Sequence, residues 1–356
     1  MKKLFVLQDG SGVYREELDT AFQKISADSL SLDIKDLSAD FLTKNGAEVV
    51  LSNGLPKEWY FTLKGLNIVT ITFGDLNAYK DLADIVIDSM NNDSRRYFAG
   101  NEASVIKNKD FDIKDVANLV RKLDWDSEYF GFNVAFISCM HLTDNIFSTI
   151  EKFVKRNNIK LLEYLCNCHD SRSVKVAEKN LFHFADMRLT FCRQLKEKEN
   201  TKLPEEVSFA RAEKVDIPEL RGISEDIYKD SRYFFDEGFE KAKAKEFYQG
   251  WVEKGVLGKY DDECWCLYDG KKPFAFCTIK YGKNESASIG LVGMDRTKHG
   301  KGFGKKLLHM VFDILFDREI KEVTVVTQGR NYAAQNLYQS VGFRTKMTQL
   351  WYHKWI

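Results

Sequence analysis

Proline is scarce in this sequence, with 4 in 356 residues, and glycine is ordinary at 22. Low-complexity, collagen-like and linker-dominated chains need many more of both, so these classes are excluded. The chain also lacks an excess of one charge, because 53 Lys and Arg balance 53 Asp and Glu. The balance gives no reason to expect a nucleic-acid partner, and any basic patch must be local.

Long hydrophobic runs are lacking too. No run approaches the length of about 18 apolar residues that a spanning helix needs, and the apolar run at residues 4–7 is too short for the core of a signal peptide. We therefore expect no membrane insertion and a cytoplasmic location. The seven cysteines are an odd number without the spacing of a disulfide framework, which favours reduced, buried thiols. Only one residue separates Cys166 from Cys168, less than zinc sites use, so we expect no metal.

What is present is a composition that can build sizeable cores, 44% hydrophobic and 13% aromatic. The length predicts two or three domains. Residues 1–113 alternate short apolar runs with helical patterns, which predicts a small parallel α/β domain. Residues 114–200 form a second block, and its last part, the charged segment 196–206, is typical of a linker. Residues 201–356 form the third block, and the expected fold class is α/β throughout.

The third block has the clearest pattern. Three antiparallel strands precede a glycine loop and an apolar-striped helix, and a strand, a helix and a closing strand follow. The expected elements are strands at 265–269, 272–282, 286–293, 322–328 and 343–355, with helices from 307 to 315 and from 331 to 341. A weak internal repeat aligns 171–193 with 331–353. It predicts tandem copies of one fold, with mixed central sheets flanked by helices; the first copy lacks the glycine loop and its chemistry. Chance similarity is the alternative.

The glycine loop at 299–306 joins a strand to a helix. Backbone N–H groups and the positive end of a helix dipole can receive a phosphate at such a place. The P-loop pattern fails at His299 and Lys306, and the dinucleotide fingerprint fails at Lys305. Five cations and one acid lie between residues 295 and 306, which suits a polyanionic ligand. A solvated surface turn is the alternative interpretation.

Together with its flanking strands, this loop resembles the GNAT family of acyl-coenzyme A transferases. The family signature is Gln/Arg-x-x-Gly-x-Gly/Ala, which residues 299–304 match at both final small positions, while His299 replaces Gln or Arg. The second family motif is Asn-x-x-Ala-x-x-x-Tyr followed by Gly-Phe. It is matched, in the family's order, by Asn331, Ala334, Tyr338, Gly342 and Phe343.

Further segments look like the TDP-fucosamine acetyltransferases of bacterial surface-polysaccharide synthesis. These segments are residues 125–131, 230–235, 247–267, 289–293 and 326–331. The resemblance covers roughly residues 118–356 and implies acetyl-coenzyme A as cosubstrate. It also implies that the small-molecule acceptor is a nucleotide-linked amino-deoxysugar, such as a TDP-4-amino-4,6-dideoxyhexose, whose amine attacks the thioester directly.

The resemblance implies roles for individual residues. The strand at 286–292 would splay from the strand at 323–327, so that pantetheine pairs with exposed backbone. A backbone N–H near Leu291 would polarise the thioester carbonyl, and Tyr338 would be the catalytic acid that protonates the leaving thiolate. A core tyrosine is the alternative for Tyr338. The base stays unassigned, since the strand at 286–292 carries no carboxylate. The implied cofactor-binding residues are Leu291, Val292, Gly293, His299, Gly300, Lys301, Gly302, Phe303, Gly304, Lys305, Thr327, Asn331 and Ala334.

The acceptor site is implied by fewer residues. Ser231, Arg232 and Tyr233 match a segment that borders the acceptor pocket in the resembled enzymes, and an arginine suits a nucleotide diphosphate. Asp126 is expected to line the same cleft. The alternatives are a polar helix end for the first three and a packing role for Asp126.

Residues 1–110 have only a faint resemblance, to the nucleotide-binding half of the nucleotide-sugar hydrolases of pseudaminic acid synthesis. Asp9, Gly12 and Arg15 match, but no histidine precedes His141. We favour a plain α/β accessory domain.

Two other functions stay open for the whole chain. One is a non-catalytic scaffold that binds a sugar nucleotide or acyl-coenzyme A, and the other is acetyl transfer to a peptide or antibiotic amine, because one fold serves many acceptors. The sequence also leaves open the choice between a monomer and a homodimer.

Overall fold

The computed structural model describes residues 3–7, 29–74, 76–79, 81–88, 95–99, 102–106, 119–139, 141–225 and 227–356. The chain divides into two compact units, one made of residues 1–183 and 352–356 and the other of residues 184–351. The segment 196–206 contains no helix or strand. It nevertheless docks on the second unit's helix α12 (Phe303–Asp317), because the Glu199 N–H donates to Asp313 Oδ1 at 2.6 Å. The division into three domains stays a prediction.

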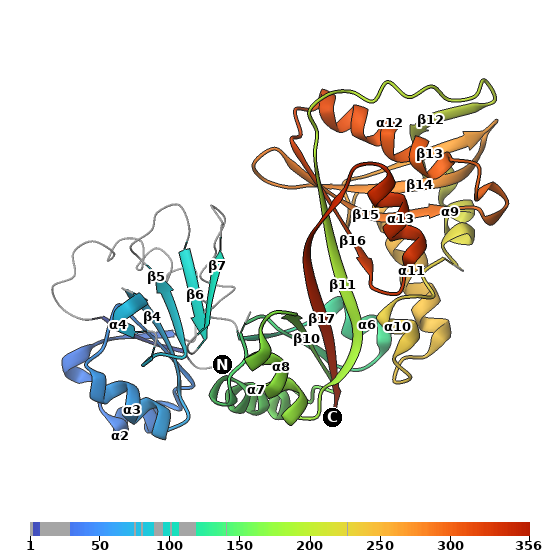
Figure 1. Ribbon diagram of the computed structural model, residues 1–356. Coiled ribbons are helices and arrows are strands. Elements are labelled where there is room, and N and C mark those ends of the chain that lie inside the picture. The colour runs from blue at the N-terminus through green and yellow to red at the C-terminus, as the bar shows by residue number, and fades with distance from the viewer. Residues whose placement is uncertain are drawn as a thin grey trace. The chain divides into compact units, whose positions relative to one another are not determined.

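The first unit begins with a seven-stranded sheet in the order β2-β1-β3-β4-β5-β6-β7 (Figure 1). Neighbouring strands from β2 to β5 are parallel, and β6 and β7 are added antiparallel. The predicted parallel sheet is therefore confirmed. Its strands are β1 (Lys3–Leu7), β2 (Ser29–Asp33), β3 (Val49–Ser52), β4 (Val69–Gly74), β5 (Ile85–Asp88), β6 (Arg95–Ala99) and β7 (Glu102–Ile106). Its helices are η1 (Ile34–Asp36), α2 (Ala39–Asn45), α3 (Lys57–Gly65) and α4 (Leu76–Tyr79).

Consecutive apolar residues explain why this sheet is parallel. All four residues of β3 are buried, as expected for a strand covered on both faces. Helix α3 lies between β3 and β4 in the chain, in agreement with the alternation of apolar runs and helical patterns. Asp9, Gly12 and Arg15, which carry the faint hydrolase resemblance, lie outside the described residues.

The first unit continues with a smaller βαβ arrangement. Strand β9 pairs antiparallel with β8 and parallel with β10. The elements are β8 (Val120–Lys122), α6 (Asp124–Phe130), β9 (Val134–Ile137), α7 (Asp144–Arg156), β10 (Leu161–Asn167) and α8 (Ser171–Lys179).

The second unit contains seven neighbouring strands in the order β12-β13-β14-β15-β16-β11-β17. The four strands from β12 to β15 are antiparallel, β15 and β16 are parallel, and β16 and β11 are antiparallel. This is the mixed sheet that the sequence predicts. The strands are β11 (His183–Gln194), β12 (Val207–Arg211), β13 (Glu263–Asp269), β14 (Lys272–Tyr281), β15 (Ser286–Met294), β16 (Glu322–Gln328) and β17 (Arg344–Trp355).

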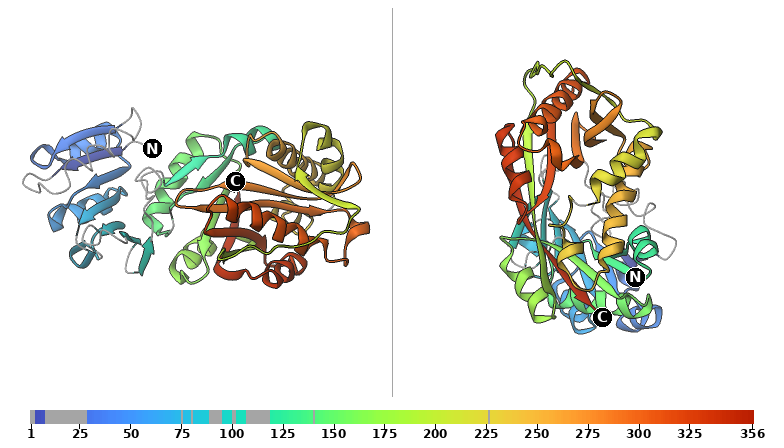
Figure 2. Two further views of the ribbon diagram at one scale, coloured as in Figure 1. Left: turned by 90° about the horizontal axis from the view of Figure 1, so that it is seen from above. Right: turned by 90° about the vertical axis from the view of Figure 1, so that its right-hand side faces the viewer.

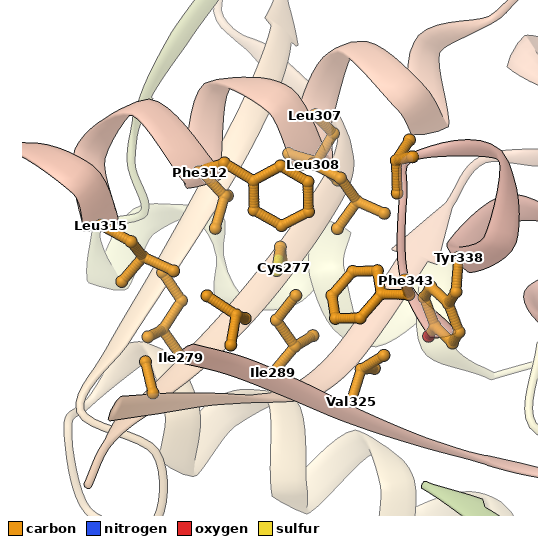
Figure 3. Packing of buried hydrophobic residues seen from close by; sticks show 14 of the residues in the cluster. Cys277, Ile279, Ile289, Leu307, Leu308, Phe312, Leu315, Val325, Tyr338 and Phe343 are labelled. Carbon is orange, nitrogen blue, oxygen red and sulfur yellow. The ribbon is translucent and has the colours of Figure 1, made fainter. Parts of the chain in front are cut away.

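Helices cover both faces of this mixed sheet (Figure 2). Helices α12 and α13 lie on one face, and α9, α10 and α11 lie on the other. The apolar stripe of α12, with Leu308 and Phe312 at its centre, packs on Cys277, Ile289 and other buried residues of the sheet (Figure 3). The remaining elements are η2 (Lys214–Asp216), α9 (Ile217–Ser224), α10 (Arg232–Phe235), α11 (Lys241–Val256), η3 (Arg296–Lys298) and α13 (Tyr332–Ser340).

The element bounds repeat along the chain, in agreement with the expected tandem units. Ser171 and Asn331 are 160 positions apart in the alignment of the repeat (331 minus 171). The same offset places α7 on α12, α8 on α13 and β11 on β17 to within about one residue at each end. Within the parts of the chain that the structure describes, no helix is long and apolar enough to cross a membrane.

Candidate functional site

The parallel strands β15 and β16 separate halfway along their length. Their pairing runs from Ser286 opposite Glu322 to Ile289 opposite Val325, and no pair follows among the described residues. Both strands continue past this point, β15 to Met294 and β16 to Gln328. The expected splay is therefore present, and it leaves the facing backbone edges open for a ligand that pairs like a strand.

A bulge in β15 directs its backbone at this point. The register against β14 shifts between Cys277 and Ile279, and one extra residue lies on β15. The Leu291 N–H donates to Thr278 Oγ1 at 2.7 Å, so it points toward β14 and is occupied. The carbonyl of the next residue, Val292, accepts from the Tyr228 hydroxyl at 3.3 Å.

These contacts indicate which backbone N–H near Leu291 faces the gap. In a strand, the N–H and C=O of one residue lie on the same edge, and consecutive residues alternate between edges. Because the Leu291 N–H faces β14, the N–H of Val292 faces the opposite edge, toward the opened gap. Val292 is therefore the better-oriented donor for a thioester carbonyl.

Two glycines of β15 are required by packing. A Cβ at Gly290 would lie 2.8 Å from Thr278 Oγ1 and against the Asp261 carboxylate, and one at Gly293 would lie against the Phe276 ring. The Asp261 carboxylate is buried and accepts from Trp251 Nε1 at 3.0 Å. A carboxylate from another segment thus fills the space where a β15 side chain would stand. No local pattern indicates this contact, because β15 itself has no acid.

The glycine loop leads into an uncapped helix N-terminus. Gly300 and Gly302 have φ values of 73° and 79°, a conformation that favours glycine. Gly302 is the N-cap of α12 and provides no side-chain hydrogen bond, so the first N–H groups of this helix are available to donate to a ligand. Gly304 instead contacts Leu337 of α13, where a Cβ would lie 3.2 Å from Leu337 Cδ1. His299 turns back along the chain, with Nε2 3.1 Å from the Met294 carbonyl oxygen.

The cations of this loop differ in their partners. Lys298 donates to Asp269 Oδ2 at 2.7 Å, and Lys306 donates to the Lys202 carbonyl at 3.2 Å. Lys301 and Lys305 are exposed and form no hydrogen bond or ion pair with any residue that the structure describes. Two unneutralised charges therefore stand at the positive end of the α12 dipole, which favours a phosphate group there.

Tyr338 lies on α13 between Phe191 and Phe343, with ring centroids 6.0 and 5.8 Å away (Figure 3). It is 5% exposed, and its burial raises the pKa of the phenol. The Tyr338 hydroxyl forms no hydrogen bond to another described residue. The phenol is therefore protonated at neutral pH and can donate this proton to a bound ligand.

The other predicted cofactor residues lie on the same elements. Thr327 is buried near the end of β16, and Phe303 begins α12 with its ring 5.0 Å from that of Phe274. Asn331 is the N-cap of α13, where its Oδ1 accepts from the Ala334 N–H at 3.0 Å. The structure therefore gives Asn331 and Ala334 a capping interaction, and their binding of a cofactor stays a prediction.

The predicted acceptor residues cluster around α10. Ser231 is its buried N-cap residue, and the guanidinium of Arg232 lies 4.2 Å from the centroid of the Tyr233 ring and 4.0 Å from that of Trp351. Asp126 lies on α6 in the other unit, and its role stays a prediction.

Sequence reasoning missed two further charges of this cluster, Asp186 and Arg330. Arg330 Nη2 lies 3.7 Å from Asp186 Oδ1. Burial raises the pKa of Asp186 to about 6, although Arg330, and less strongly Arg232, oppose the shift. Arg330 belongs to the segment 326–331 that carried the resemblance, which could have indicated it.

Comparison with known proteins identifies the fold around this site. A family model described as the acetyltransferase (GNAT) family matches residues 224–343. This range contains the splayed strands, the glycine loop and Tyr338.

One curated relative and several solved structures are similar. The dTDP-fucosamine acetyltransferase of Escherichia coli O6:H1 is 26% identical over 144 residues, which cover 40% of this chain and 61% of the relative, less than two thirds of its length. A GCN5-related N-acetyltransferase from Sphaerobacter thermophilus has 12% identity and a TM-score of 0.48, and the match covers 77% of this chain and 82% of that protein's chain. Another from Kribbella flavida has 12% identity and a TM-score of 0.47, with coverages of 68% and 92%.

Proposed function

Residues 224–343 belong to the GNAT acetyltransferase family, and from this premise we propose that the chain transfers an acetyl group from acetyl-coenzyme A to the amine of a nucleotide-linked amino-deoxysugar. One observation carries the proposal. The β15 edge opens beside an uncapped helix N-terminus that bears two unpaired lysines. A strand-like amide arm with a polyphosphate at one end matches that arrangement, and coenzyme A has this form.

The cofactor would lie along β15. Its pantetheine amides would pair along the opened edge of β15, as an added strand does, which leaves the Val292 N–H for the thioester carbonyl. Its pyrophosphate would accept from N–H groups of residues 300–304, next to Lys301 and Lys305, because the His299 N–H already donates to the Arg296 carbonyl. These residues bind and orient the thioester before the acceptor amine arrives.

The transfer forms a C–N bond and breaks the C–S bond of the thioester. The Val292 N–H, directed into the gap, would stabilise negative charge on the carbonyl oxygen, which is worth around a hundred- to a thousandfold in rate when the donor is well placed. Tyr338 would donate its phenolic proton to the leaving thiolate. The amine proton would leave through a chain of water molecules, since we assign no side chain as base.

The nature of the acceptor is supported by the curated relative, which is named a dTDP-fucosamine acetyltransferase. The arginine and aromatic side chains around α10 suit a sugar nucleotide, because a guanidinium forms bidentate hydrogen bonds with phosphate. An amino-deoxysugar would present its amine to the thioester while its nucleotide lies among these side chains.

An intact-mass assay tests the proposal. The chain is incubated with acetyl-coenzyme A and a panel of TDP- and UDP-linked 3-amino and 4-amino sugars, and the expected product gains one acetyl group. Absence of product with coenzyme binding retained would shift the acceptor to another amine. Absence of both would contradict the proposal and favour a scaffold function.

A pair of glycine variants provides a matched control. Gly302 and Gly270 both have positive φ values, 79° and 59°, and open space where a Cβ would stand. Alanine should strain each by roughly 1–2 kcal/mol. Only Gly302→Ala should weaken acetyl-coenzyme A binding, because Gly270 lies in the turn between β13 and β14. Equal affinities in the two variants would remove the loop from the cofactor site.

A further inference from the structure

Three arginines converge near β11 in the second unit. Arg188 lies on β11, Arg232 on α10 and Arg330 between β16 and α13. Arg330 is well held, since it donates to the Ala185 carbonyl at 3.0 Å and lies 3.7 Å from Asp186. Arg232 is sandwiched between two aromatic rings. The cluster contains more positive than negative charge close to the proposed acceptor site.

Arg188 is the unusual member of the cluster. It is partly buried, and its Nη1 donates to Gln349 Oε1 at 3.1 Å. Among the residues that the structure describes, no carboxylate lies within ion-pair distance of Arg188. A guanidinium removed from water without an anionic partner is costly, so a structure that keeps one is suited to an anion that arrives from outside.

The neighbours of Arg188 define where that anion would lie. Gln349 and Trp351 are alternate residues of β17, so they share one face of the strand next to β11. Arg232 stacks on Trp351. The guanidinium groups of Arg188 and Arg232 therefore contact alternate residues on one face of β17, Arg188 from the sheet and Arg232 from α10.

We propose that Arg188 and Arg232 together bind the diphosphate of the nucleotide-linked acceptor. The proposal rests on the proposed function for the identity of the ligand. Each guanidinium carries five N–H donors in a fixed planar fork, of which Arg188 uses one on Gln349 and Arg232 one on the Tyr233 hydroxyl. Such forks match the oxygens of two adjacent phosphates. A diphosphate would supply the negative charge that Arg188 lacks.

The site connects to the reaction centre through aromatic side chains. Tyr248 of α11 stacks on Tyr228 with ring centroids 4.4 Å apart, and the Tyr228 hydroxyl donates to the Val292 carbonyl. A sugar attached to a diphosphate at Arg188 and Arg232 would extend along these rings toward the opened edge of β15.

The electrostatics of the cluster agree with this geometry. Burial, and then the nearby charge of Arg232, lower the pKa of Arg188. The two cations repel each other, and an anion between them would relieve this repulsion. Asp186, the buried acid of the cluster, has a pKa raised by burial to about 6, and it faces Arg330, Arg232 and Asp230. Below this pH the cluster becomes more positive and should bind anions more tightly.

Calorimetric binding of TDP, UDP and inorganic pyrophosphate to the full chain tests the proposal. Arg188→Gln should weaken the affinity for the two nucleotides about ten- to a hundredfold, as expected for lost hydrogen bonds to a charged group. Arg344→Gln, an exposed arginine on β17, is the matched control and should leave the affinity unchanged. Acetyl-coenzyme A affinity should be equal in all three proteins, which also shows that the variants are folded.

If Arg188→Gln fails to fold, Arg188→Lys replaces it, because lysine keeps the charge but loses the planar fork. A second readout is pH. The affinity for a TDP-sugar, whose diphosphate has no proton to lose near pH 6, should rise as the pH falls from 7 to 5. Asp186→Asn should abolish that rise.

The outcomes separate this site from the proposed reaction. Equal nucleotide affinities in Arg188→Gln and the unchanged chain would overturn the site, even if acetyl transfer occurs. Failure of all three probes to bind the unchanged chain would overturn it as well. Loss of nucleotide binding in Arg188→Gln without acetyl transfer to any amino sugar would support the site and contradict the reaction. If only pyrophosphate binds, and Arg188→Gln weakens its binding by the factor expected for the nucleotides, the site would be identified as a site for a simple diphosphate.

Discussion

Gly290→Ala should be the most informative substitution in the splayed region. The backbone of Gly290 lies outside the left-handed region, so alanine is compatible with its conformation. The obstacle is space, because the new Cβ would lie 2.8 Å from Thr278 Oγ1, 2.9 Å from Asp261 Cγ and closer still to Asp261 Oδ2. Thr278 also holds the Leu291 N–H, so the whole bulge depends on this packing.

The expected cost follows from the contacts that must change. Forcing an extra methyl group into a packed site costs about 1–3 kcal/mol. Moving Asp261 also breaks its hydrogen bond with Trp251, and a bond to a charged group contributes about 1.5–3 kcal/mol. The lower conformational entropy of the unfolded alanine chain offsets about 0.4–1 kcal/mol. We therefore expect a net loss of about 1.5–5.5 kcal/mol in the free energy of unfolding.

Urea denaturation of four proteins measures this cost as a double-mutant cycle. The set is the unchanged chain, Gly290→Ala, Asp261→Ala and the double variant. Removing the Asp261 carboxylate opens the space, so Gly290→Ala should cost at least about 1 kcal/mol less in the Asp261→Ala background. An equal cost in both backgrounds would refute the reasoning, because the clash with Asp261 would then not be its source.

Three other predictions concern the cofactor site and stability. Tyr338→Phe should lower kcat about 100-fold or more and leave the dissociation constant of acetyl-coenzyme A unchanged in calorimetry; unchanged turnover would exclude Tyr338 as the acid. The double variant Lys301→Ala with Lys305→Ala should bind coenzyme A more weakly. If the binding of phosphate-free acetyl-pantetheine is weakened equally, the two lysines do not contact a phosphate. Burial opposes ionisation of Asp170, but the hydrogen bond to His141 and others outweigh it and lower its pKa to about 2. This lowered value stabilises the fold above about pH 4, and the effect is lost as the pH falls toward 2. Asp170→Asn should therefore flatten the pH dependence of the urea midpoint between about pH 4 and 2; an unchanged slope would show that Asp170 does not contribute.

Most of the architecture could be predicted because it depends on local patterns. The apolar runs that became the parallel strands β3 and β4 are buried almost throughout, as expected for strands covered on both faces. The stripe that includes Leu308 and Phe312 became the buried side of α12 because its spacing matches a helix. The glycine loop was recognisable because Gly300 and Gly302 adopt a conformation that other residues avoid.

What could not be predicted depends on contacts between distant segments. Arg188 and Arg232 come together only because β11 enters the sheet between β16 and β17, an order that no local pattern indicates. Asp261 fills the space above Gly290 from a loop that precedes β13. The sequence predicts a backbone N–H donor near Leu291, but it could not indicate which one faces the gap, because the bulge turns the Leu291 N–H toward Thr278. The segment 196–206 looks like a linker in composition, yet its backbone bonds to Asp313.

The two copies of the repeated fold end their equivalent helices differently. In the second copy, α12 begins at Gly302 with no side-chain cap. In the first copy, the Thr143 side chain caps α7 by accepting from the Ile146 N–H at 3.2 Å, and no glycine occurs between Ser138 and Thr143. A helix start that is already satisfied offers little to a phosphate. Of these two equivalent helix starts, only that of α12 lacks a side-chain cap, so we expect coenzyme to saturate at one equivalent per chain.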